Sequence, residues 1–396
     1  MKKTNLFSIV LIATALLSYA CSKKMGGPTP IPPTPTDGRV FYKPNQFVMG
    51  IDMSYTNQLE DNNARFRDSN KAKDPFVLLH DRGANLVRVR LWHNPSWSAK
   101  LNVAGKMYSD LEDVAKTIKR AKEAGMQVNL DIHYSDDWAD PSQQIVPEAW
   151  KNAPFAVLKD SVYNYTLSVL NYLKARNLTP EMVQVGNENN MGMCAPLGKI
   201  VNNDFQPFGD LLKSGIKAVR DFSANSAVKP QIILHVAQLQ DADWWANGVI
   251  NKAGVTDFDV LGVSHYYQWA TIKTMANIGT SVKSLKTKFG KKVMIVELAY
   301  SWTTQNGDGY NNLMSNQAAM PDYPMTPDGQ LKYLQDFTQI LISNGGTGIM
   351  YWEPTWITST MRDKWGTGSS WDNNTLFDFT GNALIGANYM TYNYKF

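Results

Sequence analysis

The sequence predicts an α/β fold in which eight parallel strands alternate with helices and close into a (β/α)8 TIM barrel. Three observations lead to this prediction. Short apolar runs recur along the chain, and longer segments with the spacing of amphipathic helices separate most of them. In addition, no G-x-G-x-x-G or Walker phosphate loop occurs, although an open doubly wound sheet normally carries such a loop after its first strand. The open sheet is therefore the second choice.

The predicted strands are apolar runs, rich in Val, Ile and Leu, that end at glycine or at polar residues. Each run is too short for a helix of ordinary length, so we assign it to a strand. In chain order the eight runs are Phe47–Asp52, Asn85–Leu91, Gln127–His133, Met182–Asn187, Gln231–Val236, Asp259–Ser264, Lys292–Glu297 and Gly348–Trp352.

Helical spacing fills most of the intervals between these strands. Leu111, Val114 and Ile118 recur at intervals of three and four, and Gly125 supplies a stop signal for the helix that they predict. The same periodicity predicts three further helices, over Val157–Arg176, Phe208–Phe222 and Leu331–Ser343.

The composition indicates a well-packed protein with an aromatic binding surface. Of the 396 residues, 43% are hydrophobic and 19% are charged, and 12 are tryptophan. Such a surplus of tryptophan indicates a lined groove as well as a core. Removal of Lys2 and Lys3 with a leader reduces the net charge from +4 to +2, and no stripe of basic residues is present. We therefore exclude nucleic acid as a partner.

The first residues resemble the export signal of a bacterial lipoprotein. Met1-Lys2-Lys3 and the apolar stretch Leu6–Leu17 predict a signal peptide over residues 1–20. Ser18-Tyr19-Ala20-Cys21 resembles a lipobox and predicts lipidation of Cys21; an ordinary secretory signal is the alternative. With Cys21 lipidated, the other cysteine, Cys194, has no intramolecular disulfide partner.

Residues 21–40 contain a tether between this anchor and the folded domain. Gly26–Gly38 holds five prolines in 13 positions, a composition typical of an extended, semi-rigid spacer. The single catalytic domain is predicted over residues 41–396, as a monomer attached to the membrane only through the lipid. We expect an outer-membrane-anchored lipoprotein at the cell surface or on the periplasmic face. No later stretch approaches the roughly 20 apolar residues of a membrane helix.

The residues at the strand ends carry the prediction of function, because the chemistry of such barrels lies at the C-terminal ends of the strands. Glu188 follows the fourth predicted strand and Glu297 ends the seventh, which places the two carboxylates across the barrel mouth. Two carboxylates roughly 5 Å apart are what a retaining glycosidase uses, one as nucleophile and one as acid/base. Arg90 is a candidate donor to keep the nucleophile ionised.

Other chemistries fit the sequence less well. There are only five histidines and no H-E-x-x-H spacing, which argues against catalytic zinc, and no G-x-S-x-G elbow indicates an α/β-hydrolase. Cys194 is interpreted as a small buried hydrophobe. We interpret Trp352 as a platform for a sugar ring rather than as barrel packing. His133, beside Asp136 and Trp138, is interpreted as a site residue rather than a core histidine.

Several segments together resemble glycoside hydrolase family 53, the endo-β-1,4-galactanases. The similarity covers about Gly50 to Phe379. The matching segments are Arg88–Pro95, His133–Pro141, Gly186-Asn187-Glu188, Val296-Glu297 and Gly368–Asp378. Gly-Asn-Glu alone is shared by a whole clan of related barrels, so the second-strand, third-strand and eighth-strand segments distinguish the family.

The resemblance implies a retaining endo-hydrolase of β-1,4-galactan, the side chain of pectic rhamnogalacturonan I (arabinogalactan type I). It implies that Glu188 is the acid/base, Glu297 the nucleophile, Asn187 a contact of the sugar 2-hydroxyl, and Arg90 and Tyr266 supports of Glu297. The predicted substrate-binding residues are Arg90, Trp92, His133, Asp136, Trp138, Asn187, His265, Tyr266, Trp302 and Trp352. The chain departs from the family's common pattern at His265 and Leu298.

The resemblance also implies calcium, which some bacterial members bind between the loops after strands seven and eight. The stretch from position 306 to 312 has the alternating oxygen spacing of a site for a hard cation. The alternative is an ordinary Asn/Asp/Gly turn. The predicted ligands of this structural Ca²⁺ are Asn306, Asp308, Tyr310, Asn312, Ser370 and Asp372; catalysis itself needs no cofactor.

Two rival functions remain open at this point. The nearer is another retaining endo-glycanase of the same clan, acting on mannan or glucan. The other is a non-catalytic surface glycan-binding lipoprotein, which predicts a lost carboxylate, whereas both carboxylates are present.

Overall fold

The computed structural model describes residues 47–102, 105–315 and 318–396. The predicted signal peptide, Cys21 and the proline-rich tether lie outside the described residues. Eight parallel strands form a closed barrel in the order β1-β10-β9-β8-β7-β6-β5-β4, which confirms the predicted barrel over the open sheet. The strands are β1 (Val48–Asp52), β4 (Leu86–Leu91), β5 (Gln127–Ile132), β6 (Met182–Val185), β7 (Gln231–Ala237), β8 (Val260–Tyr266), β9 (Lys292–Ala299) and β10 (Gly348–Tyr351).

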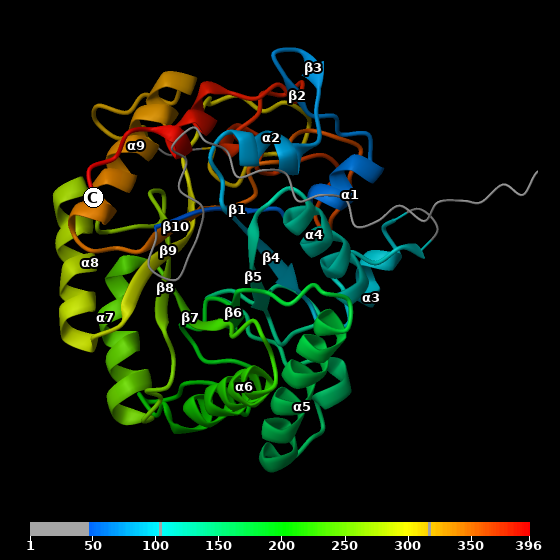
Figure 1. Cartoon of the computed structure of the whole chain (residues 1–396), viewed down its shortest axis with the longest axis vertical. Coiled ribbons are helices and arrows are strands. Elements are labelled where there is room, and N and C mark those ends of the chain that lie inside the picture. Colours follow the sequence, from blue (N-terminus) through cyan, green and yellow to red (C-terminus); the bar gives the residue numbers. More distant parts are fainter. Residues whose placement is uncertain (1–46, 103–104, 316–317) are drawn as a thin grey trace, which may run out of the picture. The chain divides into compact units, whose positions relative to one another are not determined.

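Helices cover the outside of the barrel in chain order, as Figure 1 shows. They are α1 (Thr56–Asp61), α2 (Pro75–Asp81), α3 (Ser96–Ala99), α4 (Leu111–Glu123), α5 (Phe155–Lys174), α6 (Gln206–Ala224), α7 (Leu239–Asn247), α8 (Met275–Phe289) and α9 (Pro327–Ser343). A two-stranded antiparallel ribbon, β2 (Arg67–Asp68) and β3 (Lys71–Ala72), lies outside the barrel sheet. None of the helices within the described residues is long and apolar enough to cross a membrane.

The helix ends follow from local chemistry. The Asp110 side chain accepts a hydrogen bond from the Asp113 N–H at 2.9 Å and caps α4, and Thr326 caps α9 through the Gly329 N–H at 3.1 Å. Helix α8 ends at Gly290, whose φ of +65° is the left-handed conformation that glycine adopts readily. These caps fix where α4 and α9 begin and where α8 ends.

The inside of the barrel changes from apolar to polar along the strands. Residues near the strand starts form one buried apolar cluster, which contains Val48, Leu86, Met182, Ile233, Val260, Met294, Val296 and Met350. Arg88 and Gln184 come two residues after Leu86 and Met182, on the same side of their strands, and are also buried. The barrel floor is therefore mainly apolar, and most of the polar side chains lie above it.

Candidate active site

A pocket of about 870 Å³ opens at the C-terminal ends of the strands. Glu188 and Glu297 both line it, and a carboxylate oxygen of one lies within 4.8 Å of a carboxylate oxygen of the other. Its aromatic lining residues are Trp138, Tyr266, Trp269, Tyr310, Trp352, Trp356, Trp365 and Trp371. The carboxyl separation fits the spacing of about 5 Å found in retaining glycosidases and is too short for an inverting pair.

Glu297 lies among groups that favour its ionised form. Arg88 Nη2 contacts its Oε1 at 2.8 Å, and the Tyr266 hydroxyl donates to its Oε2 at 2.8 Å. Burial raises the pKa of Glu297 to about 6, while Arg88 and Tyr266 act in the opposite direction. The Arg88 and Tyr266 contacts favour the ionised form of Glu297 and give it the environment of a nucleophile.

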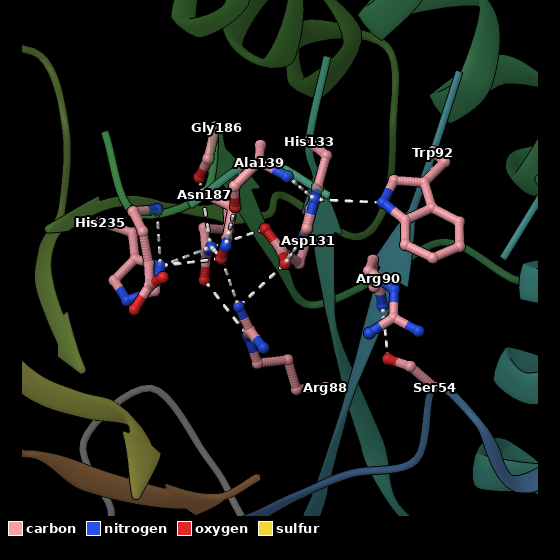
Figure 2. A network of polar contacts seen from close by, with 12 residues as sticks. Ser54, Arg88, Arg90, Trp92, Asp131, His133, Ala139, Gly186, Asn187 and His235 are labelled. Carbon is pink, nitrogen blue, oxygen red and sulfur yellow. Dashed lines mark hydrogen bonds and ion pairs between the residues drawn. The ribbon is translucent and has the colours of Figure 1, made fainter. Parts of the chain in front are cut away.

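Arg88 is the centre of a buried polar network (Figure 2). Its guanidinium contacts Asp131 at 2.8 Å and donates to Asn187 Oδ1 at 2.8 Å. It also contacts Asp52 at 2.6 Å. Burial lowers the pKa of Arg88, but the negative charges of Asp131, Glu297 and Asp52 more than offset this. The pKa lies above its usual value, so the guanidinium stays charged. One cation thus compensates several carboxylates beneath the pocket.

Among the described residues, no cation makes an ion pair with the Glu188 carboxylate. Its Oε1 accepts a hydrogen bond from the Ser264 hydroxyl at 2.6 Å. Burial, and then the negative charge of Glu297, raise the pKa of Glu188 well above its usual value. A protonated carboxyl beside an ionised one is the arrangement that an acid/base and a nucleophile require.

A buried histidine orients Ser264 toward Glu188. His235 Nδ1 accepts from the backbone N–H of Glu188 at 3.2 Å and from the Gln184 amide at 3.0 Å, with Asn187 Oδ1 also 3.0 Å away. A backbone N–H can only donate, so we assign the proton of His235 to Nε2, which lies 2.8 Å from Ser264 Oγ. The Ser264 hydroxyl then accepts from His235 and donates to Glu188.

The structure corrects the expected role of Arg90. Arg88, not Arg90, contacts the nucleophile, because Arg88 is one step deeper on the same face of β4. The Arg90 guanidinium lies 3.4 Å from Glu353 and within 4.2 to 4.6 Å of the ring centroids of Trp138, Trp92 and Tyr55. Arg90 does line the pocket, in an aromatic cage.

Several predicted binding residues also line the pocket: His133, Trp138, Asn187, Tyr266 and Trp352. His133 Nε2 contacts Asp131 at 3.0 Å, while its Nδ1 accepts from Trp92 Nε1 at 3.3 Å and from the Ala139 N–H at 3.2 Å (Figure 2). Trp92 is therefore a support behind His133 and is not among the lining residues.

Three further predicted binding residues are not among those that line this pocket. His265 packs against Phe337 of α9 with ring centroids 5.4 Å apart, because neighbouring residues of β8 point to opposite faces. Asp136 accepts from the Glu148 N–H at 2.8 Å and contacts His93, and Trp302 donates to the Asp372 carbonyl at 3.0 Å. None of the three lines the pocket.

The predicted calcium ligands divide into two groups. Asn312 Nδ2 donates to Asn306 Oδ1 at 2.7 Å and to Asp372 Oδ1 at 2.8 Å, so these three side chains converge. The others are engaged differently. Asp308 accepts from the N–H groups of Tyr310 and Ser369, and the Tyr310 hydroxyl donates to Asp363. Tyr310 and Ser370 line the sugar-sized pocket instead.

A closed (β/α)8 barrel with two such carboxyl groups at its mouth, one of them held ionised by a buried arginine, defines a glycoside hydrolase of the retaining type. The family model described as "Glycosyl hydrolase family 53" matches residues 48–390. The chain belongs to this family.

Relatives and solved structures agree with the assignment. The chain is 43% identical over 343 residues to the arabinogalactan endo-β-1,4-galactanase of Cellvibrio japonicus, covering 85% of this chain and 89% of that one. It is 32% identical over 373 residues to the endo-β-1,4-galactanase of Bacillus subtilis, covering 85% and 84%. The structure of the GH53 catalytic domain of Ignisphaera aggregans superposes with a TM-score of 0.78 at 32% identity, covering 93% and 99%.

Proposed function

We propose that this protein is a retaining endo-hydrolase of β-1,4-galactan, the polymer found in pectic arabinogalactan side chains. The observation that carries the proposal is the difference between the two carboxyl groups at the barrel mouth. Arg88 makes an ion pair with Glu297, whereas Glu188 accepts a hydrogen bond from the Ser264 hydroxyl. The galactanase activity of the Cellvibrio japonicus and Bacillus subtilis relatives supports the choice of polymer.

The reaction proceeds in two displacements. In the first, a carboxylate oxygen of Glu297 forms a bond to C1 of a galactosyl residue. The bond from C1 to the leaving oxygen breaks, and the Glu188 proton passes to that oxygen. In the second, Glu188 takes a proton from water, whose oxygen bonds to C1 while the bond to Glu297 breaks. The configuration at C1 is inverted twice and thus retained.

Product release from galactan, mannan and cellulose tests the substrate, together with Glu297→Ala. We expect the wild-type protein to release soluble galacto-oligosaccharides from galactan but not from mannan or cellulose. The Glu297→Ala variant should fold and release none of them. Release from mannan or cellulose at comparable rates would assign the chain to another polymer of the clan. Full activity of Glu297→Ala would contradict the mechanism.

We further propose that the enzyme is a lipoprotein anchored through Cys21 at the outer membrane, as a monomer. The lipobox-like Ser18-Tyr19-Ala20-Cys21 and the proline-rich tether support this. Metabolic labelling of cells with a palmitate analogue tests it: label in the wild-type protein and none in Cys21→Ser is expected. Label in both proteins, or in neither, would contradict it.

We also propose a structural calcium ion that ties the loop after β9 to the loop after β10. The Asn312 Oδ1 atom is buried without a hydrogen-bond donor among the described residues, and burial raises the pKa of Asp372 to about 6. A half turn of the Asn312 amide would add its oxygen to those of Asn306 and Asp372, the oxygen set that Ca²⁺ prefers. A chelator should lower the Tm of the wild type but not of Asp372→Asn.

A further inference from the structure

The turn that carries Glu188 has a backbone conformation that side chains rarely adopt. Gly186 has a φ of +86° and Glu188 a φ of +44°, both in the left-handed region. At position 186 a side chain would be excluded, because a Cβ there would lie 2.2 Å from Asn189 Oδ1. Glu188 does carry a side chain, so its backbone is strained. Such a conformation persists only where neighbouring groups hold it.

On one side, strand β7 holds this turn. The backbone N–H of Glu188 donates to His235 Nδ1 at 3.2 Å, and the N–H of Asn189 donates to the His235 carbonyl at 3.0 Å. These bonds fix two N–H groups of the turn. Donors to its carbonyl groups come from another element.

Gln144, in the loop after β5, supplies such donors. Its Nε2 donates to the Asn187 carbonyl at 2.8 Å and to the Glu188 carbonyl at 3.1 Å. Its Oε1 accepts from Asn189 Nδ2 at 3.1 Å. A carbonyl can only accept, so the NH2 end of the Gln144 amide must face the two carbonyl groups. One side chain thus bonds to three consecutive residues of the turn.

Gln144 is itself firmly placed. It is 6% exposed, and its backbone carbonyl accepts from the Ala195 N–H at 2.6 Å, beside the parallel bridge between Ile145 and Ala195. Its Nε2 also lies 3.2 Å from the Asp140 carbonyl. Gln144 is not among the residues that line the pocket, so any effect that it has on a substrate must pass through its neighbours.

We propose that Gln144 is a positioning residue, which holds the backbone of Glu188 in the strained conformation and so aims the Glu188 carboxyl group at the leaving oxygen. This inference rests on the proposed function and deepens it. An acid must lie within hydrogen-bond reach of the oxygen that it protonates. The Ser264 hydroxyl orients one oxygen of the carboxyl group, and the backbone sets the point from which the side chain extends.

Glu297 is held by other groups. Arg88 of β4 and the Tyr266 hydroxyl of β8 each contact its carboxylate at 2.8 Å. Gln144 takes no part in these contacts. Loss of the Gln144 amide should therefore impair proton transfer by Glu188 and leave the nucleophile in place.

The test compares two aryl galactobiosides that differ in their leaving group. Phenolate needs the proton of Glu188, whereas dinitrophenolate leaves as a stable anion without it. In both substrates a carboxylate oxygen of Glu297 bonds to C1 as the bond from C1 to the aryl oxygen breaks. We expect Gln144→Met to lower kcat/KM about tenfold or more for the phenyl substrate but about twofold at most for the dinitrophenyl substrate. Gln144→Glu, whose ionised side chain keeps the shape and loses the donors, should act in the same direction.

A second measurement asks whether Gln144 acts through Glu188. In Glu188→Ala the acid is already absent, so the addition of Gln144→Met should not lower kcat/KM for the phenyl substrate further. A residue that only stabilised the fold would lower it in both backgrounds. Thermal unfolding of each variant establishes that the comparison is made between folded proteins.

Gln330 of α9 offers a matched control. It is also a buried glutamine, and its Nε2 donates to the carbonyl groups of Tyr300 at 2.8 Å and Thr375 at 3.1 Å, but it does not line the pocket. Gln330→Met should lower the Tm and keep the wild-type ratio of the two kcat/KM values. The same ratio in the Gln144 variants, or a further loss in the Glu188→Ala background, overturns the positioning role. A wild-type protein that releases no sugar from galactan overturns the proposed function instead.

Discussion

The two catalytic carboxyl groups lie within 4.8 Å of each other, but their surroundings are opposite in kind. Glu297, on β9, faces the Arg88 guanidinium and the Tyr266 hydroxyl. Glu188, just after β6, faces Ser264, which is itself oriented by a neutral histidine. The first setting favours a negative charge, whereas the second tolerates a proton. The difference assigns the roles of nucleophile and acid without reference to any relative.

The same division continues into the pocket walls. Most of the aromatic lining residues lie on β8 to β10 or in the loops after them, with Trp138 in the loop after β5. The amides and carboxylates Asp140, Asn190, Gln238 and Asp241 lie in the loops after β5 to β7. Aromatic side chains bind sugar rings through apolar contact area, whereas polar side chains form hydrogen bonds with individual hydroxyl groups. The pocket therefore offers two kinds of contact to a sugar chain, ring faces for stacking and polar groups for hydroxyls.

Replacing Arg88 by methionine should remove the difference between the two carboxyl groups. Glu297, Asp52 and Asp131 would then be buried without their shared cation, so the nucleophile would be protonated. We expect kcat on galactan to fall about 10³-fold and unfolding stability to fall by about 3 to 5 kcal/mol. Activity assays and denaturant unfolding would measure both. Arg220→Met, which breaks only outer ion pairs with Asp257 and Asp259, is the control; equal effects of the two substitutions would contradict the role of Arg88.

Removing the Ser264 hydroxyl should instead increase the difference between the pKa values of Glu188 and Glu297. A donor to a carboxylate stabilises its ionised form, so Ser264→Ala raises the pKa of Glu188 further. Because the acid must be protonated, the alkaline limb of the pH profile of kcat/KM should move to higher pH. A fall of about tenfold in kcat is expected, since the carboxyl group is also less well oriented. Ser223→Ala, where the hydroxyl bonds only to a helix carbonyl, should leave the profile in place. A limb that moves to lower pH would contradict the assigned bond.

The sequence was sufficient for the barrel and for the two carboxylates. Eight apolar runs and the helical spacing between them are set by local residue pattern, and the closed barrel follows because each strand must bury both faces. Glu188 and Glu297 stood out because each directly ends such a run. Features that depend on a single run of residues were therefore predictable.

Side-chain depth and pairing across strands were not predictable in the same way. Arg88 and Arg90 share one face of β4, and only the packing above the apolar floor shows which of them reaches Glu297. The link from His235 to Ser264 joins two strands and has no motif. The error at His265, by contrast, was avoidable: in a strand, Ser264 and Tyr266 must share a face, so His265 points the other way.

Trp365 is one of the aromatic residues that line the pocket, and its replacement is expected to have a smaller effect than the two substitutions above. It is 65% exposed and lines the pocket, and its loop is held by the Asp363 carboxylate, which accepts from the N–H of Trp365 and of Gly366. Trp365→Ala should raise KM for polymeric galactan about threefold to tenfold, the loss of one stacking contact, with kcat nearly unchanged. Short oligosaccharides should show less effect than the polymer. A fall in kcat with constant KM would place Trp365 at the reacting residue instead.

The smallest effect on activity is expected at His265, on the outer face of β8. Both of its ring nitrogens are buried without a partner among the described residues, and burial lowers its pKa to about 3. In the unfolded chain the pKa of this histidine is about 6.5. Between about pH 3 and pH 6.5 the unfolded chain therefore binds a proton that the folded chain does not. Wild-type stability is therefore lost as the pH falls from about 6.5 toward 3.

His265→Phe removes this penalty and places a ring against Phe337. We expect galactan cleavage within about twofold of wild type and a gain of about 1 kcal/mol at pH 7, because a buried unpaired polar group is removed. The gain should be larger at pH 5 than at pH 7, which thermal unfolding at the two pH values would measure. A large loss of activity would show that His265 does reach the substrate. A stability gain independent of pH would attribute the effect to packing alone, and the neutral state of the histidine would then have no part in it.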